Sequence, residues 1–203
     1  MTDVDDLIEL FESEAERDRP ATDRPDVGII MGSDSDLDVM SGAYDALTDL
    51  GFEELTDYDD PPGADLTFET WVVSAHRTPH LMYAYAETAA ERGLEVIIAG
   101  AGGKSADLPN MTASIAYPIP VIGVPVQEKS VDSVLGMPTG APITAVDAGK
   151  SYNAALSAAL IIARQHEDLR QRLIDLHDER QRDVAAVSEA LHSQGTPGFR
   201  ENR

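Results

Sequence analysis

The sequence contains no cysteine and very little lysine. Without cysteine the chain has no disulfide bond, no thiolate nucleophile and no sulfur ligand for zinc. Lysine occurs only at Lys104, Lys129 and Lys150, so arginine carries most of the positive charge. No apolar run is long enough to span a membrane, and the acidic start at Met1–Asp6 argues against a signal or transit peptide. We therefore expect a cytoplasmic protein that does not bind a membrane.

Acidic residues dominate the charge of the chain. There are 37 Asp and Glu against 15 Lys and Arg, which gives a formal net charge of -22. Such a field repels polyanions, so we expect no nucleic-acid partner. The acids are spread through every segment instead of forming a tail. This distribution is typical of a halophilic protein, in which salt screens the self-repulsion. An acidic protein from an ordinary environment is the alternative.

The length of 203 residues indicates one domain with short additions at its ends. Residues 1–25 form an acidic N-terminal extension, which we expect to carry a short helix and to be loosely attached. Residues 26–175 form the domain itself. Residues 176–203 contain the end of a long charged helix, about 167–192, whose apolar stripe we expect to pack against another subunit. Residues 193–203 are expected to be disordered.

Within the domain, apolar runs of strand length alternate with helical patterns. The predicted strands are 27–31, 69–74, 95–99, 121–124 and 143–146. Predicted helices follow each of the first four strands, and an alanine-rich helix at 150–164 follows the fifth. The acidic stretch 52–68 reads as an exposed surface insertion. This alternation predicts an α/β fold with a flavodoxin-like, doubly wound parallel sheet between two helical layers.

The clearest candidate site follows the second long strand. There the apolar pair Val72-Val73 gives way to Ser74-Ala75-His76-Arg77-Thr78-Pro79. In open parallel sheets, ligands bind beyond the carboxyl ends of the strands. Arg77 offers a planar fork of donors for a phosphate or carboxylate, and imidazole is the side chain that changes charge near neutral pH. A loop with ordinary surface polar residues is the simpler interpretation of this stretch alone.

Three further loops, 32–36, 100–103 and 125–139, fall on the same edge of the predicted sheet. Gly32-Ser33-Asp34-Ser35-Asp36 lies between a strand and a helix, where backbone N–H groups favour an anion. One N-cap needs only one of these polar residues. Gly100-Ala101-Gly102-Gly103 follows another strand and lets a ligand approach the backbone. A dinucleotide-binding fingerprint would need a glycine at Ser105, so the Rossmann interpretation is weak. We therefore expect the first two of these loops, with Ser35 among their residues, to form part of a ligand site.

Taken together, these motifs resemble the PurE family of purine biosynthesis. The resemblance covers roughly residues 26–175 and is carried by several ordered motifs. They are Met31-Gly-Ser-Asp-Ser-Asp36, Ser74-Ala-His-Arg-Thr-Pro79, Ile98-Ala-Gly-Ala-Gly-Gly103, Leu108-Pro109, Gly123-Val-Pro-Val-Gln127, Met137-Pro138 and Asn153-Ala-Ala-Leu156.

The resemblance implies an enzyme that moves a carboxylate from N5 to C4 of an aminoimidazole ribonucleotide. It implies no ATP, metal or organic cofactor, and a homo-octamer with active sites between subunits. Ser33, Asp36 and Arg77 match the residues that hold phosphate and ribose, and His76 matches the acid/base. From the chemistry of a migrating carboxylate we add Ser74 and the N–H groups of Gly102 and Gly103 as its holders.

Departures from the family pattern keep some alternatives open. Asp107 stands where many members have histidine, and Thr139 where arginine is common, with Lys104 as a candidate replacement for the lost charge. Direct carboxylation of the ribonucleotide by carbon dioxide is the nearest rival activity. A related carboxylase acting on another ring, and a nucleotide-binding module without catalysis, are the others. A mere binder would need Arg77 but not the imidazole of His76.

The charge distribution makes a prediction about salt. Because added potassium chloride screens repulsion among the acids, we expect the melting temperature to rise with salt concentration and the fold to weaken on dialysis to low salt. Thermal denaturation followed by circular dichroism over a series of potassium chloride concentrations measures this. A melting temperature independent of salt would contradict the halophilic interpretation.

Overall fold

The computed structural model describes residues 3–202, and its organising element is one parallel sheet. The strands are β1 (Val27–Met31), β2 (Glu53–Glu54), β3 (Thr67–Val72), β4 (Val96–Ala101), β5 (Val121–Pro125) and β6 (Thr144–Ala145). They lie in the order β2-β3-β1-β4-β5-β6. Without the two-residue β2, this is the doubly wound order of flavodoxin-like folds. The predicted fold class is confirmed.

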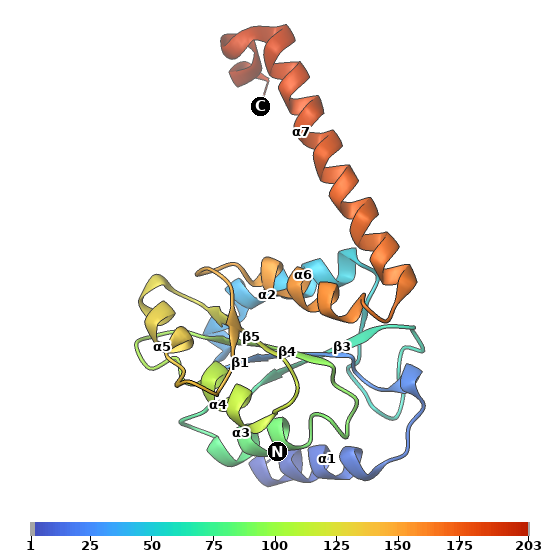
Figure 1. Ribbon diagram of the computed structural model, residues 1–203, viewed down its shortest axis with the longest axis vertical. Coiled ribbons are helices and arrows are strands. Elements are labelled where there is room, and N and C mark those ends of the chain that lie inside the picture. Colours follow the sequence, from blue (N-terminus) through green and yellow to red (C-terminus); the bar gives the residue numbers. More distant parts are fainter. Residues whose placement is uncertain (1–2, 203) are drawn as a thin grey trace. The chain divides into compact units, whose positions relative to one another are not determined.

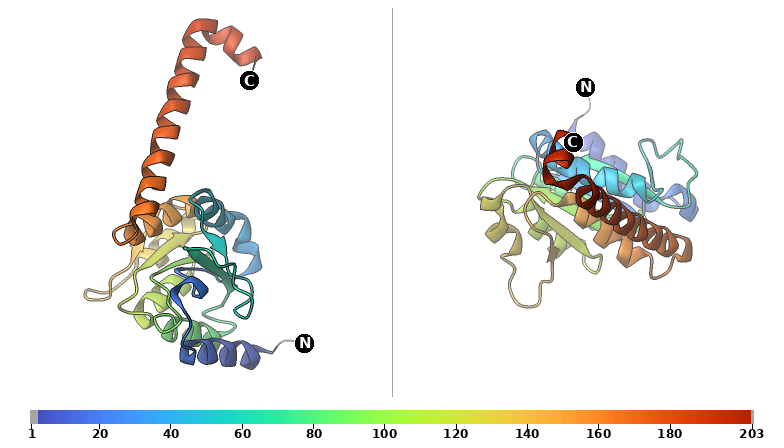
Figure 2. Two further views of the ribbon diagram at one scale, coloured as in Figure 1. Left: turned by 90° about the vertical axis from the view of Figure 1, so that its right-hand side faces the viewer. Right: turned by 90° about the horizontal axis from the view of Figure 1, so that it is seen from above.

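Helices cover both faces of the sheet (Figure 1). The helices are α1 (Val4–Glu16), α2 (Leu37–Asp49), α3 (Pro79–Glu87), α4 (Leu108–Ile115), α5 (Val131–Leu135), α6 (Ser151–Ile162) and α7 (Glu167–Glu201). The pair α2 and α6 pack together on one face, while α1, α3 and α4 lie on the other (Figure 1 and Figure 2). The alanines of α6 make the close contact possible, since Ala154, Ala155, Ala158 and Ala159 are all fully buried.

The buried strands explain why the sheet forms where the sequence predicts it. All five residues of β1 are buried, as are all six of β4, because strands covered by helices on both faces read as continuous apolar runs. At Gly100 in β4, an added Cβ would lie 2.2 Å from the sulfur of Met40 on α2. Only glycine therefore lets α2 rest on the sheet at this point.

The N-terminal segment is packed against the domain, which corrects the prediction that it is loosely attached. Phe11 of α1 is fully buried. Its ring makes edge-on contacts with Trp71 at 5.0 Å and Tyr85 at 5.2 Å between centroids. An amphipathic pattern alone does not reveal that the apolar face has aromatic partners on β3 and α3. The expectation failed for that reason.

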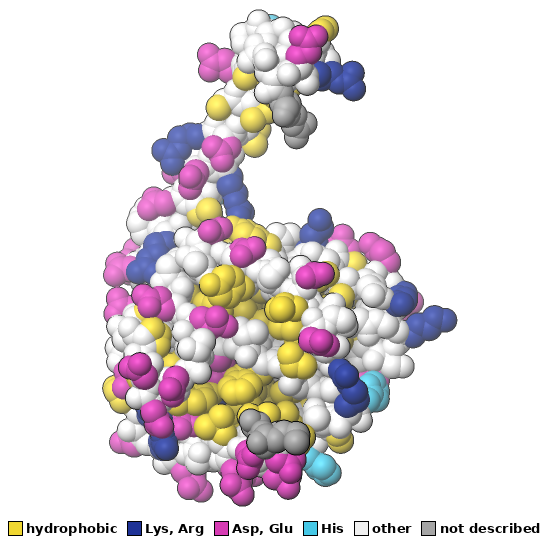
Figure 3. Space-filling view, turned by 180° about the vertical axis from the view of Figure 1, so that it is seen from behind, with side chains coloured by type: hydrophobic (Ala, Val, Ile, Leu, Met, Phe, Trp, Pro, Cys, Tyr) yellow, Lys and Arg dark blue, Asp and Glu magenta, His cyan; other side chains and the backbone are white. Residues whose placement is uncertain are grey.

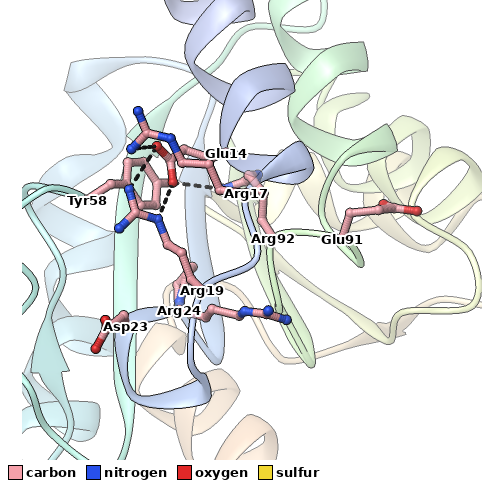
Figure 4. A pocket seen from close by; sticks show the side chains of 9 residues that line it. Glu14, Arg17, Arg19, Asp23, Arg24, Tyr58, Glu91 and Arg92 are labelled. Carbon is pink, nitrogen blue, oxygen red and sulfur yellow. Dashed lines mark hydrogen bonds and ion pairs between the residues drawn. The ribbon is translucent and has the colours of Figure 1, made fainter.

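Ion pairs fasten the end of α1 to the following loops (Figure 4). The buried carboxylate of Glu14 accepts from Arg19 at 2.6 Å and pairs with Arg17 at 2.9 Å. Both arginines also reach Asp59, and the hydrogen bond from Arg17 is the main reason why the pKa of that carboxyl is lowered. The acidic loop around Asp59 is therefore tied to the N-terminal segment.

The stretch 52–68 is not the exposed insertion that its composition predicts. Phe52, Leu55, Tyr58 and Leu66 are buried, and the stretch includes β2. The Tyr58 hydroxyl donates to Glu69 and accepts from Arg92. Burial, and then the charge of Glu69, raise the pKa of Tyr58 above its ordinary range. Polar residues lie between these buried side chains, and for that reason the composition of the stretch predicts an exposed insertion.

A buried ion pair lies beneath this stretch. Arg92 donates to Glu69 at 2.6 Å, and both side chains are 1% exposed. The Arg92 guanidinium also stacks on the rings of Phe11 and Tyr85, at 4.8 and 4.6 Å. Burial alone would lower the pKa of Arg92, but the attraction of Glu69 raises it overall. Removing either partner would leave a buried charge without its counter-ion, which is strongly destabilising.

The chain divides into two compact units, one up to Ile162 and one from Ala163. The second unit is mainly α7, whose helical geometry breaks at Gly195. Apart from the break at Gly195, residues 193–201 are helical, so the predicted disorder is wrong there, and residue 203 lies outside the described residues. Several apolar side chains of α7 are exposed: Ile174, Val184, Val187 and Leu191. The predicted division of the chain at residues 25 and 175 stays a prediction.

The surface agrees with the dispersed charge read from the sequence. Acidic side chains are scattered over the face shown in Figure 3, with hydrophobic side chains exposed between them. Within residues 3–202, no helix combines the length and apolar character needed to cross a membrane.

The burial of Phe11 gives a stability prediction. Phe11→Ala removes the contacts with two aromatic rings and leaves a cavity, so we expect the free energy of unfolding to fall by about 3–5 kcal/mol. Chemical denaturation in molar potassium chloride measures the change. Glu9→Ala, on an exposed position of the same helix, serves as the control and should change stability by less than about 0.5 kcal/mol. An equally small effect of Phe11→Ala would show that α1 is dispensable for stability.

Candidate active site

A cleft of about 290 Å³ opens at the edge of the sheet where the strands end. Its lining comes from four stretches, 32–36, 74–76, 101–108 and 127–129, which follow β1, β3, β4 and β5. All four loops that the sequence assigns to this edge therefore contribute. The cleft lies where doubly wound sheets bind ligands, beside the point at which the strand order reverses between β1 and β4.

Short hydrogen bonds fix the turn that carries His76. The N–H of Ser74 donates to the Thr78 hydroxyl at 2.9 Å, and the N–H of Arg77 donates to the Ser74 hydroxyl at 3.2 Å. Pro79 then begins α3, where its missing N–H is harmless. The guanidinium of Arg77 donates to the carbonyl oxygen of Gly32 at 2.7 Å, so it joins the loops after β3 and β1.

The loop after β1 places a buried carboxyl against the glycine run. Ser33 caps a short 3₁₀ turn, and Asp36 at its end is only 7% exposed. A Cβ added at Gly102 would come within 3.1 Å of the Asp36 carboxyl, so glycine is needed for this approach. Burial raises the pKa of Asp36, against the opposing effects of the Ser33 backbone and Arg77. The folded chain therefore holds this proton more tightly than the unfolded chain, and ionising Asp36 as the pH rises lowers stability.

His76 has a charged partner from a different loop. Its Nε2 lies 3.0 Å from Oδ2 of Asp107, the residue just before α4. The Ser133 hydroxyl of α5 donates to Oδ1 of Asp107 at 3.3 Å and accepts from the N–H of Ala106 at 3.0 Å. Both side chains of the pair remain accessible, His76 at 61% and Asp107 at 42%. The imidazole can therefore exchange protons with a ligand in the cleft.

The family can now be assigned. The family model described as AIR carboxylase matches residues 26–183, which is most of the chain. The chain belongs to the AIR carboxylase family. All four stretches that line the cleft lie inside the matched range.

Named relatives support the assignment. The chain is 46% identical over 177 residues to the N5-carboxyaminoimidazole ribonucleotide mutase of Mycobacterium tuberculosis, covering 84% of this chain and 92% of that one. It is 40% identical over 192 residues to the phosphoribosylaminoimidazole carboxylase of Saccharomyces cerevisiae, covering 92% of this chain but 31% of that larger protein. The crystal structure of Treponema denticola PurE superposes with a TM-score of 0.67 at 23% identity, over 83% of this chain and 99% of that one. This last similarity supports the fold.

The structure of this AIR carboxylase family member gathers nearly all the predicted site residues. Those that line the cleft are Ser33, Ser35, Asp36, Ser74, His76, Gly102 and Gly103. Arg77 does not line the cleft, but it donates a hydrogen bond to the carbonyl oxygen of Gly32, which does line the cleft. Gly103 has a φ of +86°, a conformation that favours glycine. Thus Gly100, Gly102 and Gly103 are each explained by a separate steric need.

Some cleft residues were missed by sequence reasoning. Lys129 and Gln127 line the cleft, whereas Lys104, the proposed replacement cation, does not. Gln127 lies two residues beyond the end of β5, in a loop that the sequence places at the carboxyl edge, so its position was a usable indication. Asp107 was noted only as a departure from the family pattern, with no hint that it contacts His76. Among residues 3–202, no three His, Asp or Glu side chains are grouped so that they could hold a metal ion.

Proposed function

We propose that this protein is an N5-carboxyaminoimidazole ribonucleotide mutase of purine biosynthesis. It moves the carboxylate from N5 to C4 to give 4-carboxy-5-aminoimidazole ribonucleotide. The observation that carries the proposal is His76, an accessible imidazole at the rim of a cleft built from the family's motifs. The Mycobacterium tuberculosis relative that bears this name shares 46% of aligned residues.

The loop after β1 is proposed to hold the ribonucleotide. Ser33 and Ser35 offer hydroxyls and backbone donors at the turn that leads into α2, where a helix start favours a phosphate. Arg77 lies beside this turn through its bond to Gly32 and supplies positive charge. Asp36 accepts from the ribose hydroxyls.

His76 is proposed to act as both acid and base. Its imidazolium protonates N5, and the bond from N5 to the carboxylate breaks to give carbon dioxide and aminoimidazole ribonucleotide. C4 then attacks the trapped carbon dioxide. The imidazole finally takes the proton from C4, which restores the aromatic ring and the imidazolium. Atoms and protons balance over the cycle, so the reaction is an isomerisation.

The carboxylate must be held while it moves. Ser74, the N–H groups of Gly102 and Gly103, and the ammonium of Lys129 lie around the cleft as candidate donors. In this proposal Lys129, which lines the cleft, supplies the positive charge for which the sequence offers Lys104 as a candidate. A closed pocket keeps the carbon dioxide near C4 and keeps water out.

Direct carboxylation with carbon dioxide is the second candidate function. The Saccharomyces cerevisiae relative is named phosphoribosylaminoimidazole carboxylase, and its similarity covers 92% of this chain. The two activities share the attack of C4 on carbon dioxide. They differ in whether the N5-carboxylated ribonucleotide is the source of that carbon dioxide.

Two assays in molar potassium chloride test the function. One supplies N5-carboxyaminoimidazole ribonucleotide, and the other supplies aminoimidazole ribonucleotide with bicarbonate. We expect fast conversion of the first and a need for very high bicarbonate in the second. His76→Asn should lower kcat on the first substrate by about 10²–10⁴, the usual contribution of general acid–base catalysis.

His80→Asn is the matched control, because His80 is exposed on α3 and does not line the cleft. It should retain the activity of the unsubstituted protein. Efficient turnover with bicarbonate alone would make the protein a carboxylase. Activity with neither substrate, or full activity of His76→Asn, would overturn the mutase mechanism.

We further propose a homo-oligomer, with the octamer of the PurE family as the expected form. The exposed apolar side chains of α7 support it, since Val184 is 70% and Val187 is 54% exposed in the single chain. The cytoplasmic location and the halophilic origin that we expect from the sequence stay predictions.

Light scattering in molar potassium chloride should give a mass near eight chains. Val184→Asp and Val187→Asp should each lower that mass, because they put charge on the apolar surface. Arg182→Gln, at an exposed neighbour, changes the net charge by the same one unit and should leave the mass unaltered. A monomeric mass for the unsubstituted protein would contradict the proposal.

A further inference from the structure

The contact between His76 and Asp107 has no part in the mechanism stated above. The two residues come from different loops, before α3 and before α4, yet their side-chain atoms Nε2 and Oδ2 lie 3.0 Å apart. Asp107 is also one of the residues that line the cleft. This inference rests on the proposed function of the same site.

Hydrogen-bond directions in this network follow from the carboxylate of Asp107, which can only accept. The N–H of Ala106 can only donate, and it donates to the Ser133 hydroxyl oxygen at 3.0 Å. The hydroxyl hydrogen of Ser133 is then directed to Oδ1 of Asp107, at 3.3 Å. Oδ2 remains to accept from His76, and a carboxylate accepts only when the imidazole carries hydrogen on Nε2.

We propose that Asp107 is a positioning residue that keeps hydrogen on Nε2 of His76, so that Nδ1 is the nitrogen that exchanges protons with the substrate. The imidazolium gives its Nδ1 proton to N5 and becomes the neutral form with hydrogen on Nε2. Nδ1 then has a free lone pair and takes the proton from C4.

The substitution Asp107→Asn tests the proposal because it keeps the shape and changes the hydrogen bonding. Because the Ser133 hydroxyl already accepts from Ala106, we expect it to keep donating, so that the amide oxygen turns toward it and the amide NH₂ faces Nε2 of His76. Nε2 must then accept, which moves the hydrogen to Nδ1 and blocks the return of the C4 proton. We expect kcat to fall about tenfold to a hundredfold with little change in KM. That is less than the loss of the imidazole itself.

The double variant Asp107→Asn with Ser133→Ala provides the rescue. Without the Ser133 hydroxyl, the amide is free to turn its oxygen toward Nε2, which restores the original tautomer. We therefore expect the double variant to be several-fold more active than Asp107→Asn alone. A merely structural role predicts the opposite, because two damaging substitutions would add. Asp132→Asn, at an exposed acid beside Ser133, is the control for charge and should keep full activity.

Nitrogen NMR of the imidazole reports the tautomer without any turnover. The His76 resonances are assigned by their loss in His76→Asn. We expect hydrogen on Nε2 in the unsubstituted protein, on Nδ1 in Asp107→Asn, and on Nε2 again in the double variant. An unchanged tautomer in Asp107→Asn, or a double variant less active than the single one, would overturn the positioning role.

The two readouts separate this inference from the function on which it rests. The expected tautomer changes in a protein inactive on both ribonucleotides would overturn the mutase function and leave the pairing of His76 with Asp107 intact. Turnover of the N5-carboxylated substrate with no tautomer change in Asp107→Asn would overturn the positioning role of Asp107 and leave the mutase function intact. Asp107→Asn is expected to fold, because asparagine has the same shape and is well tolerated just before a helix.

Discussion

The place of β1 between β3 and β4 is the constraint on which the site depends. In the parallel register, Met31 lies beside Val72 on one side and Gly100 on the other. Three loops therefore leave the sheet at nearly the same level, and they carry the serines, the histidine and the glycines of the cleft. A slip of one residue would turn every buried side chain of β1 to the other face. The buried, apolar character of β1 thus sets the geometry of a site that contains none of its residues.

The site is also assembled from segments that lie far apart in the sequence and hold one another in place. Gly100 allows α2 to lie against β4, so it helps to place Asp36 over Gly102. Arg77 joins the loop after β3 to the loop after β1. The contact between His76 and Asp107 joins the same loop after β3 to the loop after β4. Arg77 and the pair of His76 with Asp107 are therefore held from two elements at once. Such support is what catalytic groups need, because small displacements reduce rates sharply.

Sequence alone was sufficient for the fold and for most of the cleft. Strand β1 was predicted at its observed bounds, because a buried strand is a continuous apolar run between breaks. Loop residues such as Ser33 and Ser74 were found because parallel strands end at one edge. The burial of Phe11 and Tyr58 was missed, since pattern shows that a face is apolar but not what covers it. The pairing of His76 with Asp107 was missed as well, because only the folded chain brings the two loops together.

The burial of Phe11 also bears on the order in which the chain is made. Helix α1 leaves the ribosome early, but Trp71 and Tyr85, which cover Phe11, belong to β3 and α3 and follow much later. Arg92, which stacks on the same ring, comes later still. During synthesis the apolar face of α1 is therefore exposed until the chain has been made as far as α3 and Arg92, when only β1, β2 and β3 of the sheet have emerged. Helix α1 therefore waits for β1, α2, β2 and β3 to be synthesised before it can reach its native contacts on β3 and α3.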